Sequence, residues 1–162
     1  RVDANEGWTF DGALARLPEL ARLGVEFVEQ PLPAAQLDDT RELRKRSPLP
    51  FVADESVHDA ADIPKLAGAF DGINLKLAKC GGIAPAREAI AVARAHGLKI
   101  LLGCMIESSL GIAAALSLAP LVDWLDLDGH LLIADDPFHG LGFRDGRLIP
   151  SDRPGLGVEP AS

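Results

Sequence analysis

Three acidic residues stand at equivalent places in three successive segments of the sequence. Asp3 lies in the stretch VDAN, Glu29 in VEQP and Asp54 in ADES. Carboxylates that share one site repel one another, and a divalent cation removes this conflict. An all-oxygen set without a cluster of His or Cys favours Mg²⁺, with Mn²⁺ as a substitute, over zinc. The alternative is that each acid pairs with an Arg or Lys of a neighbouring loop.

A lysine that could act as a base follows in the stretch INLKLAKCGG, residues 73–82. Polar and apolar residues alternate there at the period of a strand, which places Asn74 and Lys76 together on one face. A nearby cation and partial desolvation would both lower the pKa of Lys76 and make its neutral amine available. An ion pair with Asp54 is the alternative role. Lys79 has the opposite parity, so we expect it to be a surface residue of the following loop.

Two further acids alternate with leucines in the stretch WLDLDG. This pattern places Asp126 and Asp128 on one face of an expected strand, where two carboxylates would hold a cationic group. For Asp128, an Asx turn before Gly129 is the alternative. Cys104 is expected to line the same pocket rather than to act as a nucleophile, because no histidine stands at a partnering position.

Short β-rich runs alternate with longer helical patterns along the chain. Strands are expected at 1–5, 25–32, 49–56, 72–78, 98–104 and 123–129, and helices at 11–24, 37–46, 59–70, 83–97 and 108–119. Such alternation predicts a parallel sheet. Residues 144–162 are rich in Gly and Pro and are expected to form a tail or closing loop.

The spacing of the reactive residues favours a barrel over an open sheet. From Asp3 they follow at intervals of 26, 25, 22, 28 and 22 residues, about one βα unit each: Glu29, Asp54, Lys76, Cys104 and Asp126. In a (β/α)₈ barrel the C-terminal strand ends converge on one mouth, whereas a doubly wound sheet spreads them along an edge. We therefore expect an α/β fold of the (β/α)8 TIM-barrel type, incomplete, with about six βα units.

Composition excludes several classes of protein. The chain has 162 residues, 48% of them apolar and 25% charged, as expected for one globular domain with a core. A formal charge of −8 argues against nucleic-acid or membrane partners, since little would neutralise phosphates. Two cysteines, no leader-like segment and no long apolar run favour a cytoplasmic protein with reduced thiols.

Six stretches together resemble the enolase superfamily, in the branch of muconate-lactonizing enzymes and dipeptide epimerases. They are VDAN, VEQP, ADES, INLKLAKCGG, GCMIESSLG and DLDG, and PGLGVEP resembles the closing segment of the family. The resemblance covers nearly all of residues 1–162 and implies the C-terminal part of a barrel domain, without the first strands and the N-terminal capping domain. Enolase-superfamily sites pair a Lys or His base with Mg²⁺ that stabilises an ene-diolate.

The resemblance also implies a role for each candidate site residue. It implies that Asp3, Glu29 and Asp54 bind Mg²⁺ and that Lys76 is the base on one face of the α-carbon of the substrate. The pair Asp126 and Asp128 resembles the motif with which dipeptide epimerases bind the terminal ammonium of the substrate, and Cys104 would line the pocket nearby.

The implied activity is Mg²⁺-dependent epimerisation of a dipeptide, an isomerase reaction that removes the α-proton and returns one to the opposite face through an enolate. The second base of the family is the last lysine of a Lys-x-Lys strand that would precede Arg1, so we expect a fragment that is inactive alone. The expected partners are a small dipeptide and either a second copy of the chain or the missing N-terminal segment. The alternatives are a cycloisomerase, an o-succinylbenzoate synthase or an acid-sugar dehydratase of the superfamily, or a non-catalytic truncated barrel.

Overall fold

A parallel sheet of six strands, paired in sequence order, organises the protein, whose computed structural model describes residues 1–161. The strands are β1 (Val2–Asp3), β2 (Val28–Glu29), β3 (Phe51–Ala53), β4 (Gly72–Lys76), β5 (Lys99–Gly103) and β6 (Trp124–Leu125). All six expected strands are therefore present, although each is shorter than expected.

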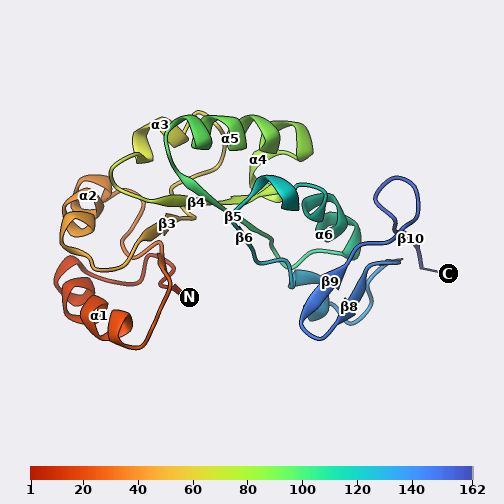
Figure 1. Ribbon diagram of the computed structural model, residues 1–162, viewed down its shortest axis with the longest axis horizontal. Helices are drawn as coiled ribbons and strands as arrows, with labels where there is room; N and C mark the ends of the chain where they lie inside the picture. The colour runs from red at the N-terminus through yellow and green to blue at the C-terminus, as the bar shows by residue number, and fades with distance from the viewer. Residues whose placement is uncertain (162) are drawn as a thin grey trace.

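Helices connect the strands and lie along one side of the sheet. They are α1 (Phe10–Arg22), α2 (Leu37–Arg46), α3 (Ile63–Leu66), α4 (Leu77–Cys80), α5 (Ile83–Ala95) and α6 (Ser109–Leu116), with short 3-10 turns η1 (Ala119–Leu121) and η2 (Gly129–Leu132). In Figure 1 the helices form an arc around the curled strands, and the N-terminus lies on the inner side of this arc. The expected fold, an incomplete (β/α)₈ barrel with about six units, is confirmed. None of the helices within residues 1–161 is long and apolar enough to cross a membrane.

The helix expected at 59–70 is reduced to the single turn of α3. Side chains before it compete for the backbone: Asp59 accepts a hydrogen bond from the N–H of Ala61 at 2.8 Å, and Asp62 accepts one from the N–H of His58 at 2.9 Å. Such local bonds favour turns over helix. Gly68, with φ of 81°, then turns the chain toward β4.

The two faces of the sheet bury different clusters of side chains. On β5, Ile100 and Leu102 pack with the helices in the main core, whereas Leu101 points to the opposite, inner face. There it joins a small cluster that includes Phe27, whose ring centroid lies 4.9 Å from that of Trp124. Because Phe27 directly precedes β2 and Trp124 belongs to β6, this contact shows how strongly the sheet curls.

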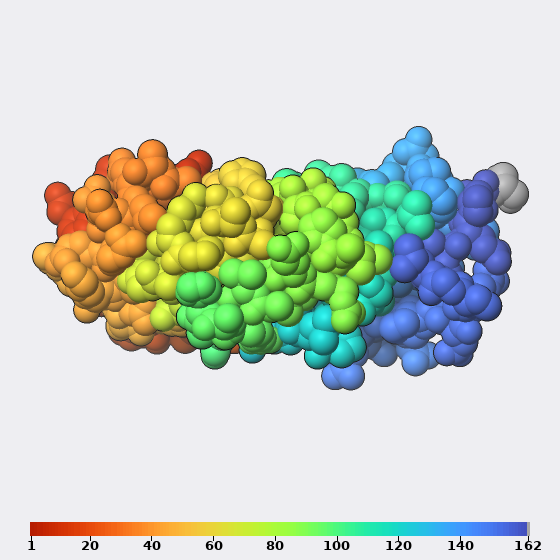
Figure 2. All heavy atoms as spheres, turned by 90° about the horizontal axis from the view of Figure 1, so that it is seen from above, coloured from red at the N-terminus to blue at the C-terminus, as the bar shows by residue number. Residues whose placement is uncertain are grey.

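The expectation of a tail or closing loop at 144–162 is wrong in part, because this region contains strands on both sides of an irregular segment at 150–158. Strands β8 (Gly142–Arg144) and β9 (Arg147–Ile149) form a hairpin, and β10 (Glu159–Pro160) pairs antiparallel with β7 (Phe138–His139). The hairpin turn consists of Asp145 and Gly146, both with positive φ, which is the signature of a type I′ turn. Figure 2 shows this C-terminal region at one end of the elongated molecule, opposite the N-terminal helices.

An arginine and an aspartate join two neighbouring units at the N-terminal ends of strands β3 and β4. Arg44 of α2 donates two hydrogen bonds to Asp71, at 2.5 and 2.7 Å. Asp71 directly precedes β4, and its carboxylate also accepts a bond of 2.8 Å from the N–H of Phe51, the first residue of β3. One carboxylate thus fixes a helix and the start of two strands.

The same arrangement recurs two units later. Arg94 of α5 donates to Asp123 at 2.7 Å, and Asp123, directly before β6, accepts a bond of 2.8 Å from the N–H of Ile100 in β5. We call these two arrangements the Arg–Asp clamps. Both lie at the end of the sheet opposite the C-terminal strand ends, so they hold the sheet without occupying its mouth.

We expect loss of either clamp to destabilise the fold. Asp71→Ala and Asp123→Ala should each lower the free energy of unfolding by about 1–3 kcal/mol, because a charged acceptor shared by an arginine and a strand N–H is removed. Urea unfolding followed by circular dichroism measures this loss. Asp38→Ala, at a fully exposed side chain that pairs with Arg41, is the matched control. An equal effect in control and clamp variants would contradict the assigned role.

Candidate active site

Three carboxylates converge at the C-terminal ends of the first three strands. Asp3 ends β1, Glu29 ends β2, and Asp54 directly follows β3. Asp3 and Glu29 are register partners across the sheet, and the three residues each offer a carboxylate oxygen within 4.8 Å of the others. Glu29 and Asp54 are 7% and 5% exposed, and Asp3 is exposed to the mouth. An open, all-oxygen set of this kind fits Mg²⁺.

Burial disfavours the ionised form of these acids unless positive charge is near. Burial raises the pKa of Glu29 to about 7, with smaller upward contributions from the charges of Asp3 and Asp54, although Asn74 donates a hydrogen bond to it. Burial also raises the pKa of Asp54, but the hydrogen bonds from Lys76 and Lys79 lower it by a larger amount. The net shift of this pKa is therefore downward. A divalent cation would favour the ionised form of Glu29 in the same way.

Two lysines bind the same metal-ligand candidate. Lys76 donates to one carboxylate oxygen of Asp54 at 2.6 Å, and Lys79 donates to the other at 2.5 Å and to the Asp54 carbonyl at 2.6 Å. Each lysine side chain is only 14% exposed. The expectation that Lys79 is a surface residue is therefore wrong. The chain turns into α4 directly after β4, and residues three apart share a helical face.

The alternative role for Lys76, an ion pair with Asp54, is present in the structure. Burial lowers the pKa of Lys76, but the hydrogen bond and charge of Asp54 raise it more, so the net shift is upward. This is opposite to the lowering expected beside a cation, because in this structure the charges that face the ammonium are carboxylates.

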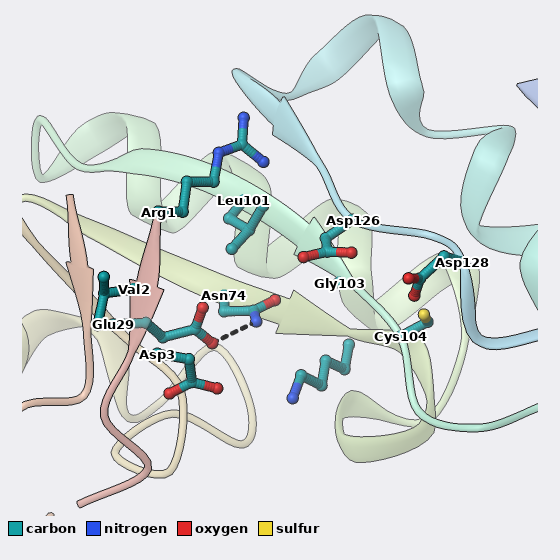
Figure 3. Close-up of a pocket in the computed structure, with 11 residues that line it drawn as sticks. Arg1, Val2, Asp3, Glu29, Asn74, Leu101, Gly103, Cys104, Asp126 and Asp128 are labelled. Carbon is teal, nitrogen blue, oxygen red and sulfur yellow. Dashed lines mark hydrogen bonds between the residues drawn. The ribbon is translucent and has the colours of Figure 1, made fainter. Parts of the chain in front are cut away.

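A cavity of about 320 Å³ connects these residues with the ends of β5 and β6 (Figure 3). Its lining contains six of the seven candidate site residues: Asp3, Glu29, Lys76, Cys104, Asp126 and Asp128. Figure 3 shows Asp3 and Glu29 on one side of Asn74 and the two later aspartates on the other. Asp54 does not line the cavity but contacts it through Lys76.

Asp126 and Asp128 face the cavity without a basic partner among residues 1–161. Burial raises the pKa of Asp126, and the neighbouring charge of Asp128 raises it further. No side-chain bond of Asp128 forms an Asx turn within the described chain, and only its carbonyl accepts, from Leu131 at 2.9 Å. A cationic group placed between the two carboxylates would offset their repulsion.

The strand expected at 123–129 is too long, because β6 ends at Leu125. Leu125 is 40% exposed and Leu127 is buried, and Asp126 and Asp128 both line the cavity, as the alternation predicted. The chain leaves the sheet to pass close to the loop after β5, where a Cβ on Gly129 would lie only 2.0 Å from the carbonyl oxygen of Met105. The backbone of Gly129 also forms a hydrogen bond with the thiol of Cys104. Burial raises the pKa of this thiol, and a raised pKa fits a pocket-lining residue rather than a nucleophile.

Asn74 is a site residue to which the sequence pattern assigned a face but no role. Its Nδ2 donates to Glu29 at 2.6 Å, and its Oδ1 is buried without a partner in the described part of the chain. Gly103 makes room for this amide, since a Cβ there would lie 2.4 Å from Oδ1. The alternation of Asn74 with Lys76 on one strand was the signal that placed it in the site.

The N-terminus of α6 is closed by a carboxylate of the protein itself. Ser108 occupies the N-cap position without a side-chain capping bond, and Asp136 accepts bonds from the N–H and hydroxyl of Ser109 at 2.7 and 2.6 Å. This helix end is therefore already supplied with an anion.

Comparison with known proteins agrees with this geometry. The family model described as "Enolase C-terminal domain-like" matches residues 1–162. An L-Ala-D/L-Glu epimerase from Bacteroides thetaiotaomicron is 44% identical over 97% of this chain and 41% of its own length. A hydrophobic dipeptide epimerase from Roseobacter litoralis is 45% identical over 97% of this chain and 46% of its own length.

A solved structure gives the same result in three dimensions. The dipeptide epimerase from Methylococcus capsulatus, complexed with Mg and the dipeptide L-Arg-D-Lys, matches with a TM-score of 0.88 and 42% identity, covering 98% of this chain and 47% of that one. The chain thus spans less than half the length of each of these relatives. With a family model that matches from end to end, this chain belongs to the enolase C-terminal domain-like family of the enolase superfamily.

Proposed function

We propose that this chain is the barrel part of a Mg²⁺-dependent dipeptide epimerase. The observation that carries the proposal is the arrangement around one cavity: a lysine beside a carboxylate triad on one side, and two unpaired aspartates on the other. The three carboxylates would hold the ion, with Mn²⁺ as a substitute, and its charge lowers the energy of an enolate.

The two sides of the cavity have complementary tasks in this proposal. Asp126 and Asp128 bind the terminal ammonium of the dipeptide, which orients the substrate so that its α-carbon faces Lys76. The names of the relatives support this substrate class, since they include epimerases of L-Ala-D/L-Glu and of hydrophobic dipeptides. An acid-sugar substrate, without an ammonium group, would leave the aspartate pair uncompensated.

Proton transfer requires a change at Lys76. Its Nζ must be neutral to accept the α-proton, and its present bond to Asp54 stabilises the ammonium form. Lys79 binds the other carboxylate oxygen and the carbonyl of Asp54, so it can keep this residue in place while Lys76 turns to the substrate. Return of a proton to the opposite face needs a second group, which we propose lies in sequence outside residues 1–162.

Lys76 should be essential for proton removal. In a protein extended upstream by a Lys-x-Lys strand, Lys76→Met should lower epimerisation of L-Ala-L-Glu, and solvent-deuterium exchange into one of the two epimers, by about 10²- to 10⁴-fold, the contribution of a general base. Proton NMR in D₂O measures both. Lys45→Met, at an exposed lysine of α2, is the control. Residues 1–162 alone should give no measurable epimerisation. Epimerisation that survives in the Lys76 variant would make this lysine structural.

The aspartate pair should recognise the substrate ammonium. In the same extended protein, Asp126→Asn and Asp128→Asn should each lower kcat/KM for L-Ala-L-Glu by at least about tenfold, because one partner of a desolvated charge pair is lost. N-acetyl-L-Ala-L-Glu lacks the ammonium group and is the matched substrate. If both substrates lose activity equally, the pair does not bind the ammonium.

We also propose that this chain associates with itself. Within residues 1–161, strands β1 and β6 each have one partner in the sheet, so each presents unpaired backbone groups, and Leu125 of β6 is an exposed apolar residue. Light scattering at micromolar concentration should therefore show a dimer or larger species. Leu125→Lys should shift the distribution toward monomer, because a charge on an edge strand opposes pairing. A monodisperse monomer of the unsubstituted chain would contradict this proposal.

A further inference from the structure

We propose that Gln30 is a positioning residue that holds the loops of all three carboxylates in register and thereby sets the affinity of the site for its cation. The inference rests on the metal site of the proposed function. It concerns a residue outside the ligand set, one that touches neither the cavity nor the substrate side of the site.

The side chain of Gln30 uses its full hydrogen-bonding capacity in the interior. It is completely buried. Its Oε1 accepts bonds from the N–H groups of Asp54 at 3.0 Å and Ser56 at 3.2 Å. Its Nε2 donates to the carbonyl of Leu32 and to the hydroxyl of Ser56, both at 2.9 Å. The amide therefore ties the loop after β2 to the loop after β3 at the residue that carries the third carboxylate.

The main chain of Gln30 extends this connection to the first carboxylate. Its carbonyl accepts a bond of 2.9 Å from the N–H of Glu6, three residues after Asp3, and its own N–H donates to the carbonyl of Val52 at 2.9 Å. Gln30 also directly follows Glu29 in sequence. Gln30 thus adjoins Glu29, binds the backbone of Asp54 and binds the loop that follows Asp3.

The backbone conformation at position 30 would favour glycine, so the bonds of its side chain explain why a glutamine stands there. Gln30 has φ of 33°, in the left-handed region that glycine adopts without strain and other residues adopt at a cost. A glycine would relieve that cost but would leave the N–H groups of Asp54 and Ser56 without their acceptor. The four side-chain bonds are what a glutamine supplies here and a glycine does not.

Ligand position matters more for Mg²⁺ than for most cations. The ion requires near-ideal octahedral geometry at short distances, so small displacements of a carboxylate reduce binding. Loss of partners that orient the ligands of a metal typically lowers metal affinity by about 10- to 100-fold. Gln30 is such a partner, because it orients the backbone of Asp54. Its side chain is neutral, so it does not change the electrostatic field at the metal site.

The test measures Mn²⁺ and Mg²⁺ affinity of residues 1–162 by calorimetry, together with the stability of each variant. Gln30→Met keeps the volume and the neutral charge but loses the amide, and it should weaken binding by about 10- to 100-fold. Gln30→Gly suits the left-handed backbone and gives the answer if the methionine variant does not fold. Asp54→Asn, which alters a proposed ligand, serves as the positive control.

Thr40→Val separates positioning from general destabilisation. Thr40 is also buried, and within residues 1–161 its hydroxyl donates only to the carbonyl of Gln36, directly before α2, at 3.0 Å. This variant should lose stability and keep the metal affinity of the unsubstituted chain. If folded Gln30 variants also keep that affinity, the positioning role is overturned while the metal site stands. If the unsubstituted chain binds neither ion, the proposed metal site fails, and the role of Gln30 fails with it.

Discussion

Mutual repulsion among three carboxylates is the constraint on which the rest of this site depends. The sheet brings Asp3, Glu29 and Asp54 within 4.8 Å of one another and buries two of them. Such a group is stable only if positive charge is supplied. Two ammonium groups on Asp54 supply it within the chain, and Glu29, with its pKa near 7, remains the member whose charge is least compensated. A cation held among the three carboxylates would therefore favour the ionised form of Glu29.

The parallel sheet explains why reactive residues far apart in sequence meet in one cavity. Strands β1 to β6 pair in order, so the residue that follows each strand reaches the same edge, and the curl of the sheet turns that edge inward. Asp126 is thereby brought across the cavity from Glu29. The distance in sequence is covered by helices that pack on the outer face and leave the inner face free for chemistry.

Much of this arrangement could be predicted from the sequence, because period and spacing encode it. The repeat of about one βα unit predicted the parallel strands and the residues at their ends. Contacts that depend on local geometry could not be predicted in this way. Parity on an ideal strand assigned Lys79 to the surface, but the early turn into α4 brought it onto Asp54. Strict alternation extended the last strand to residue 129, but β6 ends at Leu125, and the chain then passes close to the loop after β5 at Gly129.

The role of Gln30 was missed for a related reason. Its position inside the stretch VEQP marks it only as a polar residue after a strand, and its function follows from backbone groups that the sequence does not display. The C-terminal hairpin is different, since Asp145-Gly146, with Phe143 before it and Leu148 after it, is a recognisable turn signal. The expectation of a tail or closing loop rested on the Gly and Pro content of the region and overlooked this turn.

The Arg–Asp clamps separate what holds the barrel from what reacts in it. Both clamps bind strand starts, and every candidate site residue lies at or beyond a strand end. Mutations at the mouth therefore do not disturb the bonds that fix strand order at the opposite end. A scaffold divided in this way can accept new substrates by exchange of mouth residues at little cost in folding, which makes the fold evolvable. The names of the relatives specify chemically different dipeptides. Such variety is expected if mouth residues can change without disturbing the clamps.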